Sequence, residues 1–189
     1  MGNDTTPEDL IELLQRNPEK FAENKKYGYP VPIDRIISDC DIDLHFKLYE
    51  DDDISGECGF RNNRFFIAVN HQEPDYRQRF TLAHELGHIV LHLWQKTGKG
   101  SVLITDSKKT MFRSSDWDGK EYEANAFAAK LLMPKDEVLK QIQKIVDERD
   151  SYKFRDDQIR QELVNPLAVY FLVSPSAIEF RLKNLKILN

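Results

Sequence analysis

Two histidines and a glutamate stand at a spacing that suits metal chemistry. Residues 79–92 read RFTLAHELGHIVLH and contain His84, Glu85 and His88 in the pattern His-Glu-x-x-His. On a helix, residues four apart project from one face about a turn apart, so both imidazoles can bind one metal ion. Glu85 adjoins His84 and can take the proton of a water molecule that the metal activates. The pattern therefore predicts a hydrolytic zinc site.

The competing interpretation is a buried helix whose histidines make ordinary hydrogen bonds. An apolar face surrounds the motif and indicates a central helix; it comprises Leu82, Ala83, Leu86, Ile89, Val90 and Leu93. Buried polar groups cost free energy unless they have partners. Two histidines and a glutamate on such a helix are therefore better explained by a metal than by its absence.

A catalytic zinc usually has three protein ligands and one open position, so a third ligand is required. His92 is the nearest candidate, but on a continuous helix it would lie ~12 Å from His84 along the axis. We therefore expect His92 beside the site and outside the ligand set. A carboxylate on the alanine-rich segment 121–134 is the better candidate, and spacing alone does not choose between Glu121 and Glu123.

Residues 79–92, followed by EANAFAAKLLMP at 123–134, resemble the ImmA/IrrE family of bacterial zinc metallopeptidases. The resemblance covers the chain from about residue 30 to residue 188. It implies zinc ligands His84, His88 and Glu123, with Glu85 as general base, and it leaves Glu121 outside the motif as a solvated residue. It also implies a substrate: helix-turn-helix repressors of the Xre type, whose cleavage would release transcription.

Length and composition restrict the remaining classes of protein. The chain has 189 residues and a hydrophobic fraction of 40%, which favours one globular domain. Its formal net charge of −5 argues against a broad electrostatic surface for nucleic acid. Direct DNA binding is therefore not expected. No apolar run approaches the ~20 residues that span a bilayer, and the N-terminus lacks a signal-peptide pattern. With Cys40 and Cys58 expected to be free thiols, we predict a cytoplasmic protein without membrane contact.

The patterning of the chain predicts an α+β fold. Alternation over 42–48 and a hairpin across Asn62-Asn63 indicate a small antiparallel sheet in the first 70 residues. Helices are expected over 75–93, 119–133 and 134–149, and a C-terminal helical hairpin over 163–188 with a break near Ser174-Pro175. We expect the sheet to pack on a helical zincin-like core. The predicted organisation is a helical arm at 1–29 and one metallopeptidase domain at 30–189.

Further segments and residues are candidates for binding substrate, covering the site or stabilising the oxyanion. The strand 64–70 is a candidate edge for an extended substrate, and the long connection 96–117 is a candidate lid. Tyr122, Tyr170 and His92 are equal candidates for stabilising the oxyanion.

The C-terminal hairpin also resembles a helix-turn-helix, although a packed hairpin is favoured; Arg181, Lys183 and Lys186 keep DNA contact as an alternative. The rival function is a regulator or antitoxin-like protein that binds a partner or DNA without cutting and keeps zinc as a structural element.

Overall fold

A four-stranded sheet forms one layer of the molecule. The computed structural model describes residues 5–23, 28–94, 101–107, 119–148 and 160–188. The strands are β1 (Asp43–Lys47), β2 (Ile54–Arg61), β3 (Arg64–Asn70) and β4 (Val102–Ser107), arranged in the order β1-β3-β2-β4. β2 is antiparallel to β3 and to β4, whereas β1 is parallel to β3. The expectation of an antiparallel sheet is therefore wrong for β1, because the returning strand of the hairpin lies between β1 and β2.

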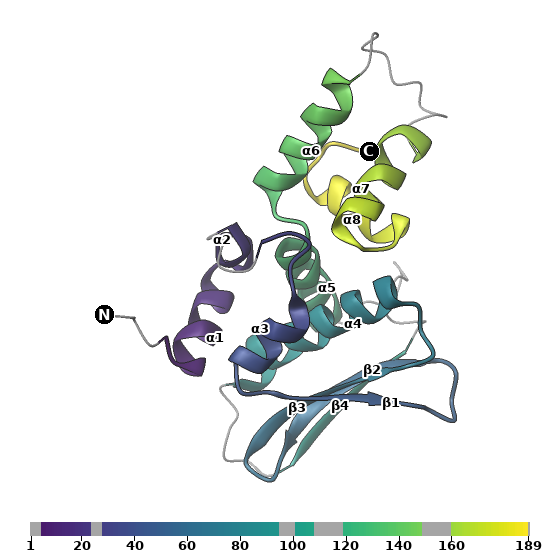
Figure 1. Ribbon diagram of the computed structural model, residues 1–189. Helices are drawn as coiled ribbons and strands as arrows, with labels where there is room; N and C mark the ends of the chain where they lie inside the picture. The colour runs from purple at the N-terminus through teal and green to yellow at the C-terminus, as the bar shows by residue number, and fades with distance from the viewer. Residues whose placement is uncertain (1–4, 24–27, 95–100, 108–118, 149–159, 189) are drawn as a thin grey trace.

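Helices supply the rest of the fold, which confirms the α+β class. They are α1 (Pro7–Arg16), α2 (Pro18–Glu23), α3 (Ile33–Asp39), α4 (Asp75–His88), the π-helical η1 (Ile89–Leu93), α5 (Gly119–Leu132), α6 (Lys135–Asp147), the π-helical η3 (Arg160–Val164), α7 (Asn165–Phe171) and α8 (Pro175–Asn184). Helix α4 lies against the sheet, and α6, α7 and α8 lie on the side of α4 and α5 away from the sheet (Figure 1). This arrangement places α4 at the centre of the core.

Asparagines make the turn between β2 and β3. Asn62 and Asn63 have φ angles of 51° and 61°, and Arg61 pairs with Arg64 across the two-residue loop. Asparagine tolerates this left-handed conformation better than most residues, so the predicted hairpin is confirmed with its predicted turn.

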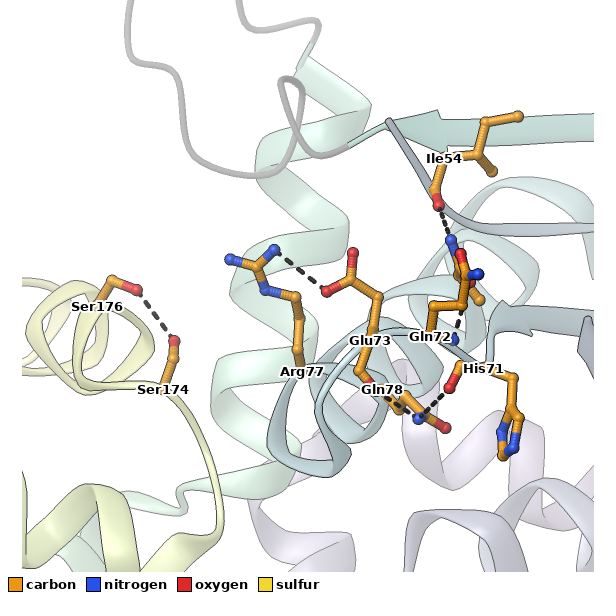
Figure 2. A network of polar contacts seen from close by, with 9 residues as sticks. Ile54, His71, Gln72, Glu73, Arg77, Gln78, Ser174 and Ser176 are labelled. Atoms are coloured by element: carbon orange, nitrogen blue, oxygen red, sulfur yellow. Dashed lines mark hydrogen bonds and ion pairs between the residues drawn. The ribbon is translucent and has the colours of Figure 1, made fainter. Parts of the chain in front are cut away.

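Polar contacts fix the start of α4 in the turn that follows β3 (Figure 2). The side-chain amide of Asn70 donates to Ile54 O at 2.9 Å, and its oxygen accepts the Gln72 N–H at 3.0 Å. Gln78 Nε2 then donates to Glu73 O at 2.6 Å, which joins the turn to the first turns of the helix. The turn thus connects the start of α4 to strand β2.

The N-terminal helices pack into the same hydrophobic core as the rest of the chain. Leu10, Ile11, Leu14 and Phe21 are buried within it. Gln15 Nε2 also donates to the backbone oxygen of Val90 in η1 at 2.6 Å. The arm is therefore docked along its length, and its boundary at residue 29 stays a prediction.

The C-terminal hairpin is packed in the structure. Arg181 of α8 is 2% exposed, donates to Met133 O at 2.8 Å and pairs with Glu19 of α2. The Arg181 side chain is thus engaged in contacts within the protein.

In the described part of the chain, no single helix is long and apolar enough to cross a membrane. The segments Glu162–Phe171 and Pro175–Asn184 pass that test only as a pair bent by 106°.

Candidate metal centre

A close crossing of α4 and α5 creates the site. A Cβ at Gly87 would lie 3.1 Å from the Phe127 ring and 3.2 Å from the Ala124 Cα. Small residues on both helices therefore let the two backbones approach, as the alanine-rich sequence of α5 predicts. This approach brings the polar side chains of α5 to the histidines of α4.

His84, His88 and Glu121 converge at this crossing. Each offers one ligand atom, and these atoms lie within 4.8 Å of one another. The two Nε2 atoms are 3.0 Å apart, and the Glu121 oxygens lie 3.4 Å from His84 Nε2 and 3.2 Å from His88 Nε2. Both histidines are fully buried, whereas 17% of the Glu121 side chain is exposed. The geometry thus directs two nitrogens and a carboxylate at one small volume.

This donor set suits a divalent first-row cation. Two imidazoles and one carboxylate are a ligand set known from catalytic zinc sites, and three protein ligands leave a fourth position open. Without a cation, the same three groups would place a carboxylate beside two buried imidazoles. Burying these polar groups without enough hydrogen-bond partners would cost free energy. The residues present therefore fit a metal ion.

The structure differs from the expectation for the third ligand. Glu123 lies away from the cluster, with Oε2 3.6 Å from His92 Nε2 and 61% of its side chain exposed. The physical reason is helical rotation, since two residues turn the side chain by about 200°. Glu121 and Glu123 therefore leave α5 on different sides, and Glu121 is the one that faces His84 and His88.

Glu85 is held against the sheet. It is fully buried, and a Cβ added to Gly56 of β2 would lie 2.8 Å from Glu85 Oε1 and 2.6 Å from Thr81 Cγ2. Only glycine permits this approach of strand and carboxylate. Gly56 was not expected at the site from the sequence, although a glycine inside a predicted strand is a signal for such a contact. The role of Glu85 as general base stays a prediction.

Asn125 of α5 is a second residue at the site that was not expected from the sequence. Its Oδ1 lies 3.1 Å from His84 Nδ1, and the side chain is buried. The available signal was its position four residues after Glu121, which places both side chains on the same helix face.

Comparison with known proteins identifies the family. Residues 37–183 match the model of the IrrE N-terminal-like domain, Peptidase_M78. The chain belongs to the M78 metallopeptidase family. A search of curated proteins found no match. The resemblance to ImmA/IrrE proteins is therefore confirmed, and with it a hydrolase of the metallopeptidase class.

The geometry separates the three oxyanion candidates of this M78 peptidase. Tyr170 donates its hydroxyl to Glu137 at 2.7 Å on the α6 side of the molecule. Tyr122 packs edge-on against Phe180, with ring centroids 6.3 Å apart. The ring of His92 lies 5.6 Å from that of His88. His92 therefore lies beside a residue of the cluster.

His92 lies outside the ligand cluster, in agreement with the helix-length argument. Its Nε2 is 3.4 Å from the Lys120 carbonyl oxygen. Burial and the neighbouring His88 lower the pKa of His92 below its usual range, which favours the neutral imidazole.

Proposed function

We propose that this M78 peptidase is a zinc-dependent endopeptidase with ligands His84, His88 and Glu121 and general base Glu85. The observation that carries the proposal is the convergence of the three ligand atoms within 4.8 Å in a chain of a metallopeptidase family. The ligand set replaces Glu123 with Glu121 and keeps the other predicted residues.

The residues of the site have distinct roles in this proposal. When bound, the zinc supplies a Lewis acid that polarises the scissile carbonyl and makes water more acidic. Glu85 accepts the proton of the attacking water and delivers it to the leaving amine. Gly56 of β2 lies close to the Glu85 carboxylate and so limits its movement toward the sheet. Glu121 is the ligand that reaches solvent, which favours entry of substrate and water from its side.

The sheet suggests where an extended substrate would lie. Strand β3 is paired on both sides, so the expectation that 64–70 forms the substrate edge is wrong. Among the described strands, β1 and β4 each have a neighbour on one side only, and β4 is the one that pairs with β2 beside Glu85, through Asp106 and Gly56. We place the substrate along β4, which makes up part of the connection expected as a lid; the rest of 96–117 lies outside the described residues apart from Ser101. Added hydrogen-exchange protection of Val102–Ser107 on peptide binding would support this placement, and unchanged exchange would contradict it.

The proposed substrate is a helix-turn-helix repressor of the Xre type, cut in the cytoplasm to relieve repression. This part of the proposal rests on the resemblance to ImmA/IrrE peptidases.

The experiment compares wild type with Glu85→Gln, because this change removes the base and keeps the side-chain volume. Both proteins are loaded with zinc and incubated with purified Xre-type repressors and, separately, with a proteome-derived peptide library. We expect wild type to create new N-termini, Glu85→Gln to create none, and both to retain about one zinc per chain. Cleavage of the peptide library without cleavage of any repressor would reject the repressor as substrate and would still support the endopeptidase activity.

The rival function is partner binding with a structural metal. Complete burial of His84, Glu85 and His88 is the observation in its favour. It predicts that Glu85→Gln leaves the biological effect intact and that wild type cuts neither substrate set. Zinc retention together with that outcome would overturn the peptidase mechanism.

A further inference from the structure

We propose that Asn125 is a positioning residue of the metal centre: its amide oxygen accepts the Nδ1–H of His84 and so reserves Nε2 of His84 for the metal. The inference rests on the metal site proposed above. It concerns a residue that makes no contact with the metal and acts through His84.

The geometry around His84 assigns separate tasks to its two ring nitrogens. Nε2 points into the cluster, 3.0 Å from His88 Nε2 and 3.4 Å from Glu121. Nδ1 lies 3.1 Å from Asn125 Oδ1, and both side chains are buried. A neutral imidazole carries one N–H, so a proton held on Nδ1 leaves the lone pair on Nε2. A ligand histidine needs this tautomer, and a hydrogen bond to its second nitrogen is the usual means of selecting it.

The two helices contribute matched pairs of residues. His84 and His88 are four apart on α4, and Glu121 and Asn125 are four apart on α5. Each pair therefore lies on one helix face, and the faces meet at the close crossing described above. One face of α5 thus supplies both a ligand and the acceptor that orients the opposing ligand. The position of α5 sets both contacts together.

The amide nitrogen of Asn125 supports a specific role for the amide oxygen. Within the described residues, Asn125 Nδ2 is buried without a hydrogen-bond partner. An unpaired buried donor costs free energy, so a residue selected only for packing would be apolar here. The contact with His84 is what asparagine provides at this position.

The variants test the acceptor separately from the branched shape of the side chain. Asn125→Leu keeps this shape and removes the acceptor, whereas Asn125→Asp keeps the acceptor. We expect Asn125→Leu to bind Zn²⁺ about 10–100-fold more weakly than wild type in competition with a chromophoric chelator. Asn125→Asp is expected to bind at least as tightly as wild type, because a carboxylate makes the histidine a stronger ligand. Wild-type affinity in Asn125→Leu would overturn the inference.

A matched control excludes a general effect of losing a buried amide. Gln141 of α6 is 8% exposed and donates to Glu137 at 2.6 Å, on an element that contributes no ligand. Gln141→Leu should therefore leave the zinc affinity unchanged. An equal loss of affinity in Gln141→Leu and Asn125→Leu would assign the effect to stability and overturn the role of Asn125.

The tautomer can also be read in unaltered protein. Long-range ¹H–¹⁵N correlation of the histidine rings should show His84 protonated at Nδ1 in the metal-free chain and bound through Nε2 in the zinc-loaded chain. A proton on Nε2 in the metal-free chain, or coordination through Nδ1, would overturn the inference. If wild type binds no zinc, the proposed function fails instead, and the metal-free spectrum still decides the contact between Asn125 and His84.

Discussion

Glu121 and Glu123, two residues apart on α5, present their carboxylates to different histidines. The Glu121 oxygens lie 3.2 Å and 3.4 Å from the Nε2 atoms of His88 and His84, whereas Glu123 lies 3.6 Å from His92. The two side chains have identical chemistry and differ in the direction in which the helix points them. They therefore form a matched pair for testing the ligand set.

Glu121→Gln should abolish tight metal binding, and Glu123→Gln should preserve it. We expect the zinc affinity of Glu121→Gln to fall by about 100-fold or more, because a ligand carboxylate becomes a neutral amide. Metal content after dialysis and competition with a chelator measure the difference. The opposite pattern, with zinc lost only in Glu123→Gln, would restore the ligand expected from the resemblance.

Gly56→Ala should impair catalysis while zinc stays bound. The new methyl group would stand 2.8 Å from Glu85 Oε1 and 2.6 Å from Thr81 Cγ2, so the carboxylate must move. Displacing a catalytic group by ~1 Å costs about 100-fold in rate, so we expect kcat to fall by about that factor. Gly119→Ala is the control, since a Cβ there meets no atom of the described residues within 4 Å. Equal kcat values in the two variants would contradict the positioning of Glu85 by β2.

The sequence predicted those parts of the site that depend on local periodicity. Because His84 and His88 are four residues apart on one helix, their convergence follows from helix geometry alone. The turn at Asn62-Asn63 likewise depends on the conformational preference of two adjacent residues. In both cases the relevant interactions lie within a few residues of each other.

Features that depend on contacts between distant segments could not be predicted in the same way. The choice between Glu121 and Glu123 requires the rotation of α5 about its axis against α4. The parallel pairing of β1 with β3 and the addition of β4 require partners far along the chain. The hydrogen bond between His84 and Asn125 spans 41 residues. Each of these features depends on how distant segments pack together, and local sequence patterns do not determine that packing.

Acid should destabilise the protein partly through Glu137. Burial raises the pKa of Glu137, but hydrogen bonds from Tyr170, Gln141 and Lys140 outweigh it and hold the pKa below its usual 4.5. A carboxyl whose pKa is lowered by folding contributes stability above its unfolded pKa and loses it as the pH falls through the folded pKa. The contribution is therefore complete above about pH 5 and is lost at lower pH.

Tyr170→Phe tests this contribution, because it removes the donor whose hydroxyl lies 2.7 Å from Glu137. We expect a loss of about 1 kcal/mol in the free energy of unfolding at pH 7, and a smaller loss at pH 3. Urea unfolding at both pH values measures the difference. Parallel stability profiles for wild type and variant would contradict the coupling of Tyr170 to the titration of Glu137.

Arg181→Met separates a packed hairpin from a DNA-binding one. Arg181 is buried, donates to Met133 O and pairs with Glu19. Its loss therefore leaves the carbonyl without its hydrogen-bond donor and the carboxylate without its cation. We expect the free energy of unfolding to fall by about 2–4 kcal/mol. Lys183→Met, an exposed neighbour on α8, should change it by less than about 0.5 kcal/mol. Unchanged stability in both variants, together with loss of a salt-sensitive DNA complex in a mobility-shift titration, would favour the helix-turn-helix interpretation over the packed hairpin.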